Sequence, residues 1–402
     1  MLETQNQSTS LVTAQIDMTH NTNDIKNLTF YASVLITVES SAALIINLYL
    51  LNCSRYLRHP AGINVQLCVS LMVADAACAV FYMTSNFINV IIPTILHQDD
   101  IVSHCISLLV ECLKIATFFA SVFTLLALAL NHYIGIVHPL YSSSITHKAV
   151  RTAITFAYIL PFVFFIGLYS IVPGGFRNDV AFGFFSMKGC AGGNIMRKFS
   201  VRLITVIPFI AFVIIIVSLY VHIVIHMRML EKNPLIQSGI TYQRRRGSNR
   251  RLLITILLLA GSAVFGWLPT LLSYVVFCNR CPVRLQGYPL MCLLILCQII
   301  NVLKLILDGF VYATRLIEIR FAIWRFHTSF KSYFPGQTEK ATHVPVKFEK
   351  YLRSTNDISA VAQKRRKTSI RRTRSVDSRN YSPDDGDSQT DFRYQIPAPL
   401  KI

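Results

Sequence analysis

Residues 121–141 form the stretch on which the fold depends, and their sequence is SVFTLLALALNHYIGIVHPLY. An apolar run of helical length meets the polar triplet Asn131, His132 and Tyr133, and Pro139 then interrupts the helical pattern. A soluble domain does not need such a run, whereas a helix that crosses a bilayer needs about 20 residues. Because the triplet cannot remain in hydrocarbon, we interpret this stretch as the inner end of a third membrane helix.

The composition is that of a membrane protein. Of the 402 residues, 53% are hydrophobic and only 15% are charged, against about 25% charged residues in an average soluble protein. The formal charge of +19 comes from basic residues clustered between or after the apolar runs, which favours contact with a lipid bilayer over nucleic-acid binding. We therefore expect an all-α membrane protein that does not bind nucleic acid.

Seven apolar runs from residue 31 onwards are long enough to cross a bilayer. The loops between them are short, except for the loop before residue 199. We therefore predict a seven-transmembrane-helix bundle. The runs cover residues 31–52, 63–92, 106–137, 149–172, 199–226, 252–277 and 288–312.

The distribution of lysine and arginine predicts the orientation of the chain. Of the 39 basic residues, 29 fall on one side of the predicted membrane, eight on the other, and two, Lys114 and Lys304, lie within runs. Since the more basic side usually faces the cytosol, we expect a multi-pass protein of the cell membrane with an extracellular N-terminus and a cytoplasmic C-terminus. No cleavable leader is visible, so the first run is expected to direct insertion.

We divide the chain into three parts. Residues 1–30 are polar and are predicted to be disordered, with glycosylation sequons at Asn6 and Asn27. Residues 31–326 form the transmembrane domain, which ends in a short amphipathic eighth helix over residues 313–326. Residues 327–402 are predicted to be a disordered basic tail that contacts lipid or is phosphorylated. Three candidate phosphorylation sites each follow an arginine by three residues: Thr368, Ser369 and Ser375.

Landmark residues along these runs carry a family resemblance. In their order and spacing they resemble the rhodopsin-like family of G-protein-coupled receptors, and the resemblance covers about residues 31–325. Any one motif is weak, whereas seven runs with these landmarks in order are strong. The landmarks are Asn47, Arg58-His59-Pro60, Asn64, Leu71, Asp75, Ser121, Tyr133, Pro139, Pro208, Trp267-Leu268-Pro269 and Tyr312.

The resemblance implies a receptor for an extracellular ligand that couples to a heterotrimeric G protein and to arrestin. Two departures affect the activation motifs: Asn131-His132-Tyr133 replaces Asp-Arg-Tyr, and Asp308-Gly309 begins the motif that the family starts with Asn-Pro. His132 is shorter than arginine, and an imidazole is mostly neutral at cytosolic pH. A receptor with altered activation motifs and a receptor-like protein that does not couple to G proteins therefore both remain open.

The inner surface is expected to meet the G protein. The resemblance assigns this role to Asn131, His132 and Tyr133, together with the basic end of the third inner loop at Arg250 and Arg251.

On the outer side, Cys105 and Cys190 resemble the family's pair of bridged cysteines, although Cys105 lies two residues earlier than the family spacing. Cys278 and Cys281 form a second disulfide or remain as two thiols, since no further ligands favour a metal there.

The ligand site is expected in the outer half of the bundle, above Trp267. Lys114 lies where amine receptors of the family carry an aspartate, so it would repel amines. It either binds a carboxylate or carbonyl-rich ligand, or pairs with Glu111 one helical turn earlier. The long loop from 173 to 196 makes a peptide the favoured ligand class.

An internal polar network is expected in the middle of the bundle. In the family, Asp75 and Ser121 help to bind a sodium ion together with asparagines at positions 304 and 308, which here are Lys304 and Asp308. We predict that the lysine ammonium replaces the ion, because an unpaired charge in a membrane is costly. The alternative is a lysine that reaches toward Glu39 or into a wet cavity.

Two other classes of function are alternatives to a receptor. In a transporter or channel, Glu39, Asp75, Lys304 and Asp308 would form a charged pathway, but the sequence shows no internal repeat with paired broken helices. An enzyme is the weakest reading, because the sequence has no metal-ligand cluster or nucleophile motif. We expect neither a cofactor nor a metal.

Overall fold

The computed structural model describes residues 2–57, 61–96, 102–142, 145–176, 190, 192–232, 240–277, 288–331, 345–346, 348–349 and 351–353. The chain divides into two units, Met1–Ala341 and Thr342–Ile402. In the second unit, Arg353 lies 2.6 Å from Glu349 in an exposed ion pair. Several predicted sites lie outside the described residues or side chains: Asn6, Arg250, Arg251, Cys278, Cys281, Thr368, Ser369 and Ser375.

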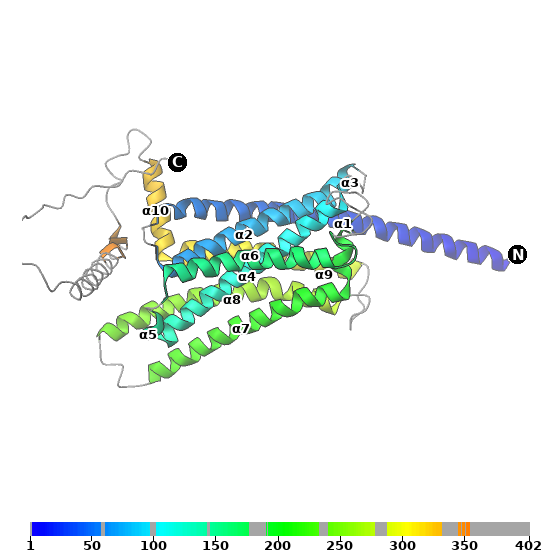
Figure 1. Cartoon of the computed structure of the whole chain (residues 1–402). Coiled ribbons are helices and arrows are strands. Elements are labelled where there is room, and N and C mark those ends of the chain that lie inside the picture. The colour runs from blue at the N-terminus through cyan, green and yellow to red at the C-terminus, as the bar shows by residue number, and fades with distance from the viewer. Residues whose placement is uncertain are drawn as a thin grey trace, which may run out of the picture. The chain divides into compact units, whose positions relative to one another are not determined.

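The first unit is a bundle of long helices that run alongside one another (Figure 1). Four short elements lie between the long ones: α3 (Ile92–Leu96), α5 (Pro139–Ser142), a π-helical turn at Phe87–Ile91 and a 3-10 helix at Gly192–Arg197. The long helices are α1 (Leu2–Ser54), α2 (Ile63–Asn86), α4 (His104–Val137), α6 (His147–Ile171), α7 (Phe199–Lys232), α8 (Ile240–Val276), α9 (Tyr288–Arg315) and α10 (Ile317–Lys331).

The predicted seven spans are present. Among the described residues, six helices are long and apolar enough to cross a membrane, and the shorter apolar part of α8, Ala260–Val276, is the seventh. The second span extends beyond its predicted end at residue 92, because α2 continues through the π-helical turn into α3. Pro93 has no N–H to donate, and the helix widens immediately before it.

The N-terminal segment differs from the expectation. Residues 1–30 were predicted to be disordered, whereas α1 begins at Leu2 and continues without a break into the first span. The segment contains neither glycine nor proline, so no residue in it interrupts a helix that extends back from the span.

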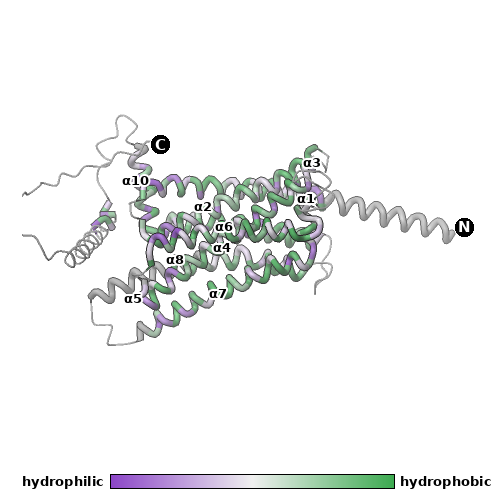
Figure 2. The backbone as a smooth tube through the Cα atoms, viewed as in Figure 1, coloured by the Kyte–Doolittle hydropathy of each residue, from purple (hydrophilic) through white to green (hydrophobic). Residues whose placement is uncertain are grey.

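The distribution of polar and apolar side chains is that of a membrane bundle. Large apolar side chains point outward, with Val38 at 61% exposure, Phe156 at 64% and Phe265 at 78%, while the charged Asp75 and Lys304 are buried. Apolar residues cover the lengths of the helices, and hydrophilic residues gather near their ends (Figure 2). The outward face therefore suits lipid, and polar groups find partners inside.

The eighth helix is present but begins later than predicted. The expected range 313–326 includes the last turn of α9, and the chain leaves the helix only at Leu316 before α10 begins at Ile317. Helix α10 crosses the end of the bundle (Figure 1) and buries Ile319, Phe321 and Ala322. Its apolar face thus packs against the bundle, including α1.

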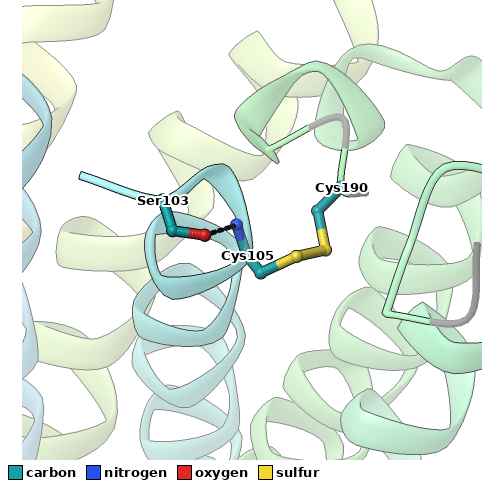
Figure 3. The surroundings of a disulfide bond; sticks show 3 residues. All are labelled: Ser103, Cys105 and Cys190. Carbon is teal, nitrogen blue, oxygen red and sulfur yellow. Dashed lines mark hydrogen bonds between the residues drawn. A yellow bond between two sulfur atoms is a disulfide. The ribbon is translucent and has the colours of Figure 1, made fainter. Parts of the chain in front are cut away.

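A disulfide between Cys105 and Cys190 ties the start of α4 to the segment before α7 (Figure 3). We call this end of the bundle, which the sequence predicts to be extracellular, the outer end, and the opposite end the inner end. The two Cα atoms lie 5.1 Å apart. Helix α4 begins immediately before this bond, where the side chain of Ser103 accepts a hydrogen bond of 3.3 Å from the backbone N–H of Cys105. The helix cap and the disulfide together fix the outer end of α4.

We predict that Cys105→Ser and Cys190→Ser each abolish surface expression, and that the double variant is no worse than either single variant. Each change removes the same covalent bond, which typically stabilises a protein by about 2 to 4 kcal/mol. Surface labelling of intact cells measures the effect. Cys292→Ser is the control, because Cys292 is a free cysteine. Clearly additive losses from the two single changes would contradict the prediction.

Candidate functional site

A large cavity lies in the outer half of the bundle, with a volume of about 1040 Å³. Its walls come from α2, α4, α7, α8, α9 and the 3-10 helix, so segments far apart in the sequence meet there. Aromatic and aliphatic side chains such as Phe118, Leu271 and Phe277 form much of the lining, with a few charged groups among them. A concave, largely apolar site with a few polar groups is typical of a small-molecule or peptide pocket.

Glu111 and Lys114 form an ion pair in the cavity wall. The Lys114 ammonium lies 2.6 Å from the Glu111 carboxylate, one helical turn away on α4. Ser85 donates a hydrogen bond to the same carboxylate, and Asn89 donates another of 3.2 Å. Of the two sequence-based alternatives for Lys114, the pair with Glu111 is therefore present, and its charge is already neutralised.

Arg202 is a second cation in the cavity wall, and the sequence analysis did not single it out. Its Nε donates to the Met196 carbonyl at 3.1 Å, and its Nη1 donates to the carbonyls of Tyr274 at 2.9 Å and Phe277 at 3.4 Å. The guanidinium carbon lies 4.4 Å from the centroid of the Tyr274 ring. An arginine in the first turn of an apolar run is a signal that could have identified it.

An aromatic layer separates the cavity from the middle of the bundle. Trp267 is 1% exposed and does not line the cavity, although it was predicted as a ligand-binding residue. Phe118, which does line the cavity, lies between: its ring centroid is 4.6 Å from that of Trp267. Phe209 packs against both rings. A ligand would therefore reach Trp267 through Phe118.

The predicted internal network forms directly beneath Trp267. The Lys304 ammonium lies 2.7 Å from Asp308 Oδ2, 3.4 Å from Asp75 Oδ1 and 3.9 Å from the Trp267 ring centroid. Ser121 donates a hydrogen bond of 2.9 Å to Asp75. The lysine is thus held between two carboxylates and the face of an aromatic ring.

One further hydrogen bond connects this network to α8. Ser262 donates to Asp308 Oδ1 at 2.5 Å, a contact that the sequence analysis did not include. The network therefore joins α2, α4, α8 and α9. The alternative pairing is not seen: within the described chain, no contact joins Lys304 to Glu39.

These residues do not fit a sodium ion of the kind that the family binds. The Lys304 ammonium already lies against both carboxylates, at the positions from which they would hold a cation. Among the described residues, no group of three or more His, Cys, Asp or Glu side chains is arranged to hold a metal.

Gly266 makes room for the lysine. A Cβ atom built at Gly266 would lie 2.7 Å from the Cβ and 2.8 Å from the Cγ of Lys304, closer than real Cβ contacts allow. Because these atoms are at the base of the lysine side chain, they cannot move away without moving α9. The glycine thus allows α8 and α9 to approach with the charged side chain between them.

The inner end carries the residues predicted to face a G protein. Asn131 donates a hydrogen bond of 2.5 Å to the side chain of Asn64, which links α4 to α2. His132 is only 4% exposed, so it points into the bundle and not toward the inner opening. The Tyr133 ring lies 5.4 Å from that of His222 on α7.

We predict that Gly266→Ala destabilises the protein by about 1 to 3 kcal/mol, because the added methyl group overpacks the α8–α9 contact at Lys304. Thermal unfolding of the purified protein measures the change. Gly261→Ala is the control on the same helix, where nothing lies within 4 Å of the added Cβ, and the substitution should be neutral or slightly stabilising. Equal stability of the two variants would contradict the packing role.

We also predict that the parent protein is insensitive to sodium, whereas Lys304→Asn gains a sodium response. The asparagine removes the tethered cation and leaves Asp75, Ser121 and Asp308 available to an ion. Thermal stability is measured against sodium, with potassium holding the ionic strength constant. Adding Asp75→Asn to Lys304→Asn should abolish the gained response.

Two outcomes would refute the sodium prediction. One is a parent protein that is already stabilised by sodium but not by potassium. The other is a Lys304→Asn variant that folds and reaches the membrane normally yet shows no difference between the two ions.

Comparison with known proteins agrees with this geometry. The family model described as 7 transmembrane receptor (rhodopsin family) matches residues 17–312, which is most of the chain and includes six spans and all but the last three residues of the seventh. A search of the curated proteins found no match. The seven spans, the Cys105–Cys190 bridge and the family match lead to one conclusion: this chain belongs to the rhodopsin family of seven-transmembrane receptors.

Proposed function

We propose that this rhodopsin-family protein is a cell-surface receptor that binds a peptide in its outer cavity and signals through a heterotrimeric G protein. The cavity is the observation that carries the proposal, because its volume of about 1040 Å³ is at the upper end for drug-sized ligands. Three basic side chains and one acidic side chain line it, a balance that disfavours amines. We also propose the orientation predicted from the distribution of lysine and arginine. In that orientation the N-terminus and the cavity are extracellular, Asn27 is a glycosylation site, and the tail is cytoplasmic.

A contact path supports transmission from the cavity to the inner end. A ligand that touches Phe118 presses on Trp267, and Trp267 lies against the Lys304 ammonium. Lys304 joins α9 to Asp75 on α2, and Asp308 joins α9 to Ser262 on α8. A shift of Trp267 therefore changes the ion network that sets the relative positions of these helices.

At the inner end, His132 limits coupling to the G protein. An Asn131 amide that donates to Asn64 cannot restrain a neighbouring arginine as a carboxylate does. The buried His132 does not offer a permanent cation to the G protein. Coupling is thus expected to be weak, with arrestin recruitment as a parallel output.

The experiment is a ligand screen in cells that express the parent or His132→Arg, read out by both G-protein activation and arrestin recruitment. The arginine is too long and too polar for the buried site, so it should turn to the inner opening and increase constitutive or ligand-driven G-protein signalling. His132→Gln is the control, since it removes the imidazole without adding a charge.

An arginine variant that reaches the surface normally but signals no more than the parent, or no more than the glutamine variant, would contradict the limit set by His132. A parent protein that responds to no peptide and activates neither pathway in either form would contradict the receptor function itself.

A further inference from the structure

Positive charge exceeds negative charge in the lining of the outer cavity. The inference drawn from this excess rests on the proposed function as a receptor. Four charged residues line the cavity: Glu111, Lys114, Lys198 and Arg202. Glu111 forms an ion pair of 2.6 Å with Lys114, so its negative charge does not offset the charges of Lys198 and Arg202. Lys198 is exposed and donates a hydrogen bond of 2.6 Å to the Pro173 carbonyl, and no carboxylate in the described part of the chain forms an ion pair with it.

The partners of Arg202 among the described residues are all neutral groups. Its three hydrogen bonds go to backbone carbonyls, two of them at the outer end of α8, and in the described part of the chain no carboxylate lies within ion-pair distance. These bonds use Nε and Nη1, whereas Nη2 makes no hydrogen bond to a described residue. The Tyr274 ring supports the guanidinium from one side.

A purely structural role would explain only part of this arrangement. Cations do stabilise the carbonyls at a helix C-terminus, and Arg202 does so for α8. However, that contact needs one edge of the guanidinium and does not compensate its full charge. The free Nη2 edge belongs to a side chain that lines the cavity, half-buried and rigidly held. This geometry suits the binding of an anion.

We propose that the outer cavity recognises a ligand through a carboxylate, which binds the Nη2 edge of Arg202 with Lys198 one helical turn away as a second positive charge. Such a carboxylate is the C-terminus or an acidic side chain of a peptide, or the head group of a small apolar acid. The aromatic and aliphatic lining near Phe118 and Leu271 accommodates the apolar body of the ligand. Lys114 takes no direct part, since Glu111 neutralises it.

The test compares acids with matched amides on the purified full-length protein. The small-molecule pair is phenylpropionate and phenylpropionamide, and the peptide pair is a pentapeptide pool ending in phenylalanine, with a free or an amidated C-terminus. Thermal unfolding is followed with a thiol-reactive dye, because five of the six free cysteines in the described part of the chain are buried: Cys53, Cys68, Cys78, Cys112 and Cys297.

In the parent protein, at least one acid should raise the melting temperature, with an apparent Kd about tenfold or more below that of its amide. Arg202→Gln should make acid and amide equivalent, and Arg202→Lys should retain only part of the preference, since lysine keeps the charge without the planar fork. Arg228→Gln is the matched control: it removes the same charge from the inner part of the same helix and should leave the preference unchanged.

The inference is overturned if no acid stabilises the parent, if acids and amides are equivalent, or if the preference survives Arg202→Gln. A preference that is lost equally in Arg228→Gln also overturns it, because the effect would then be general electrostatics. If Arg202→Gln does not unfold cooperatively, the test compares the preference for acid over amide in the parent with that in Arg202→Lys. Which pair responds identifies the source of the carboxylate.

The result is separable from the proposed function. A protein that binds acids through Arg202 but activates neither G protein nor arrestin would refute the signalling role alone. A receptor that signals in response to an uncharged or amine ligand, with no acid preference, would refute the carboxylate site alone.

Discussion

The structure depends on the pairing of one lysine in the middle of a membrane bundle. An unpaired charge at that depth costs at least about 2.5 to 3.5 kcal/mol, and breaking a buried pair typically costs about 3 to 5 kcal/mol. Lys304 avoids that cost because Asp75 on α2 and Asp308 on α9 both lie within reach of its ammonium. These ion pairs therefore help to set the positions of α2 and α9, in addition to the packing of apolar side chains. The hydrogen bonds of Ser121 and Ser262 to the same carboxylates extend this effect to α4 and α8.

The location of this network gives it a further consequence. It lies directly under the Trp267 ring, which separates it from the cavity, so the ammonium contacts the aromatic layer that a ligand would displace. A lysine bound to the chain cannot leave the bundle as a free ion does, so any rearrangement must keep the ammonium near a carboxylate. A second arrangement of the bundle would therefore have to give the ammonium a carboxylate contact of its own, as a switch between two discrete states requires.

The sequence was sufficient for the spans and for part of the site, because long apolar runs and charges within them have few structural solutions. It predicted that Lys304 would lie with Asp75 and Asp308, since residues four apart share a helix face, and the contacts are present. It did not predict Ser262 or Gly266, because these depend on how α8 and α9 approach each other. Nor did it predict the role of Arg202, since its partners are backbone carbonyls, which no residue type marks.

Three cations of similar chemistry thus have different surroundings, and the supply of carboxylates within the chain explains the difference. Lys304 is deepest and has two carboxylates, as its depth in the membrane requires. Lys114 lies in the cavity wall and has one, which cancels its charge. Arg202 lies at the outer end, where water and neutral carbonyls can support a cation that no described carboxylate neutralises. Of the three, Arg202 therefore gains the most from a ligand that brings its own negative charge, because binding there does not have to displace an internal partner.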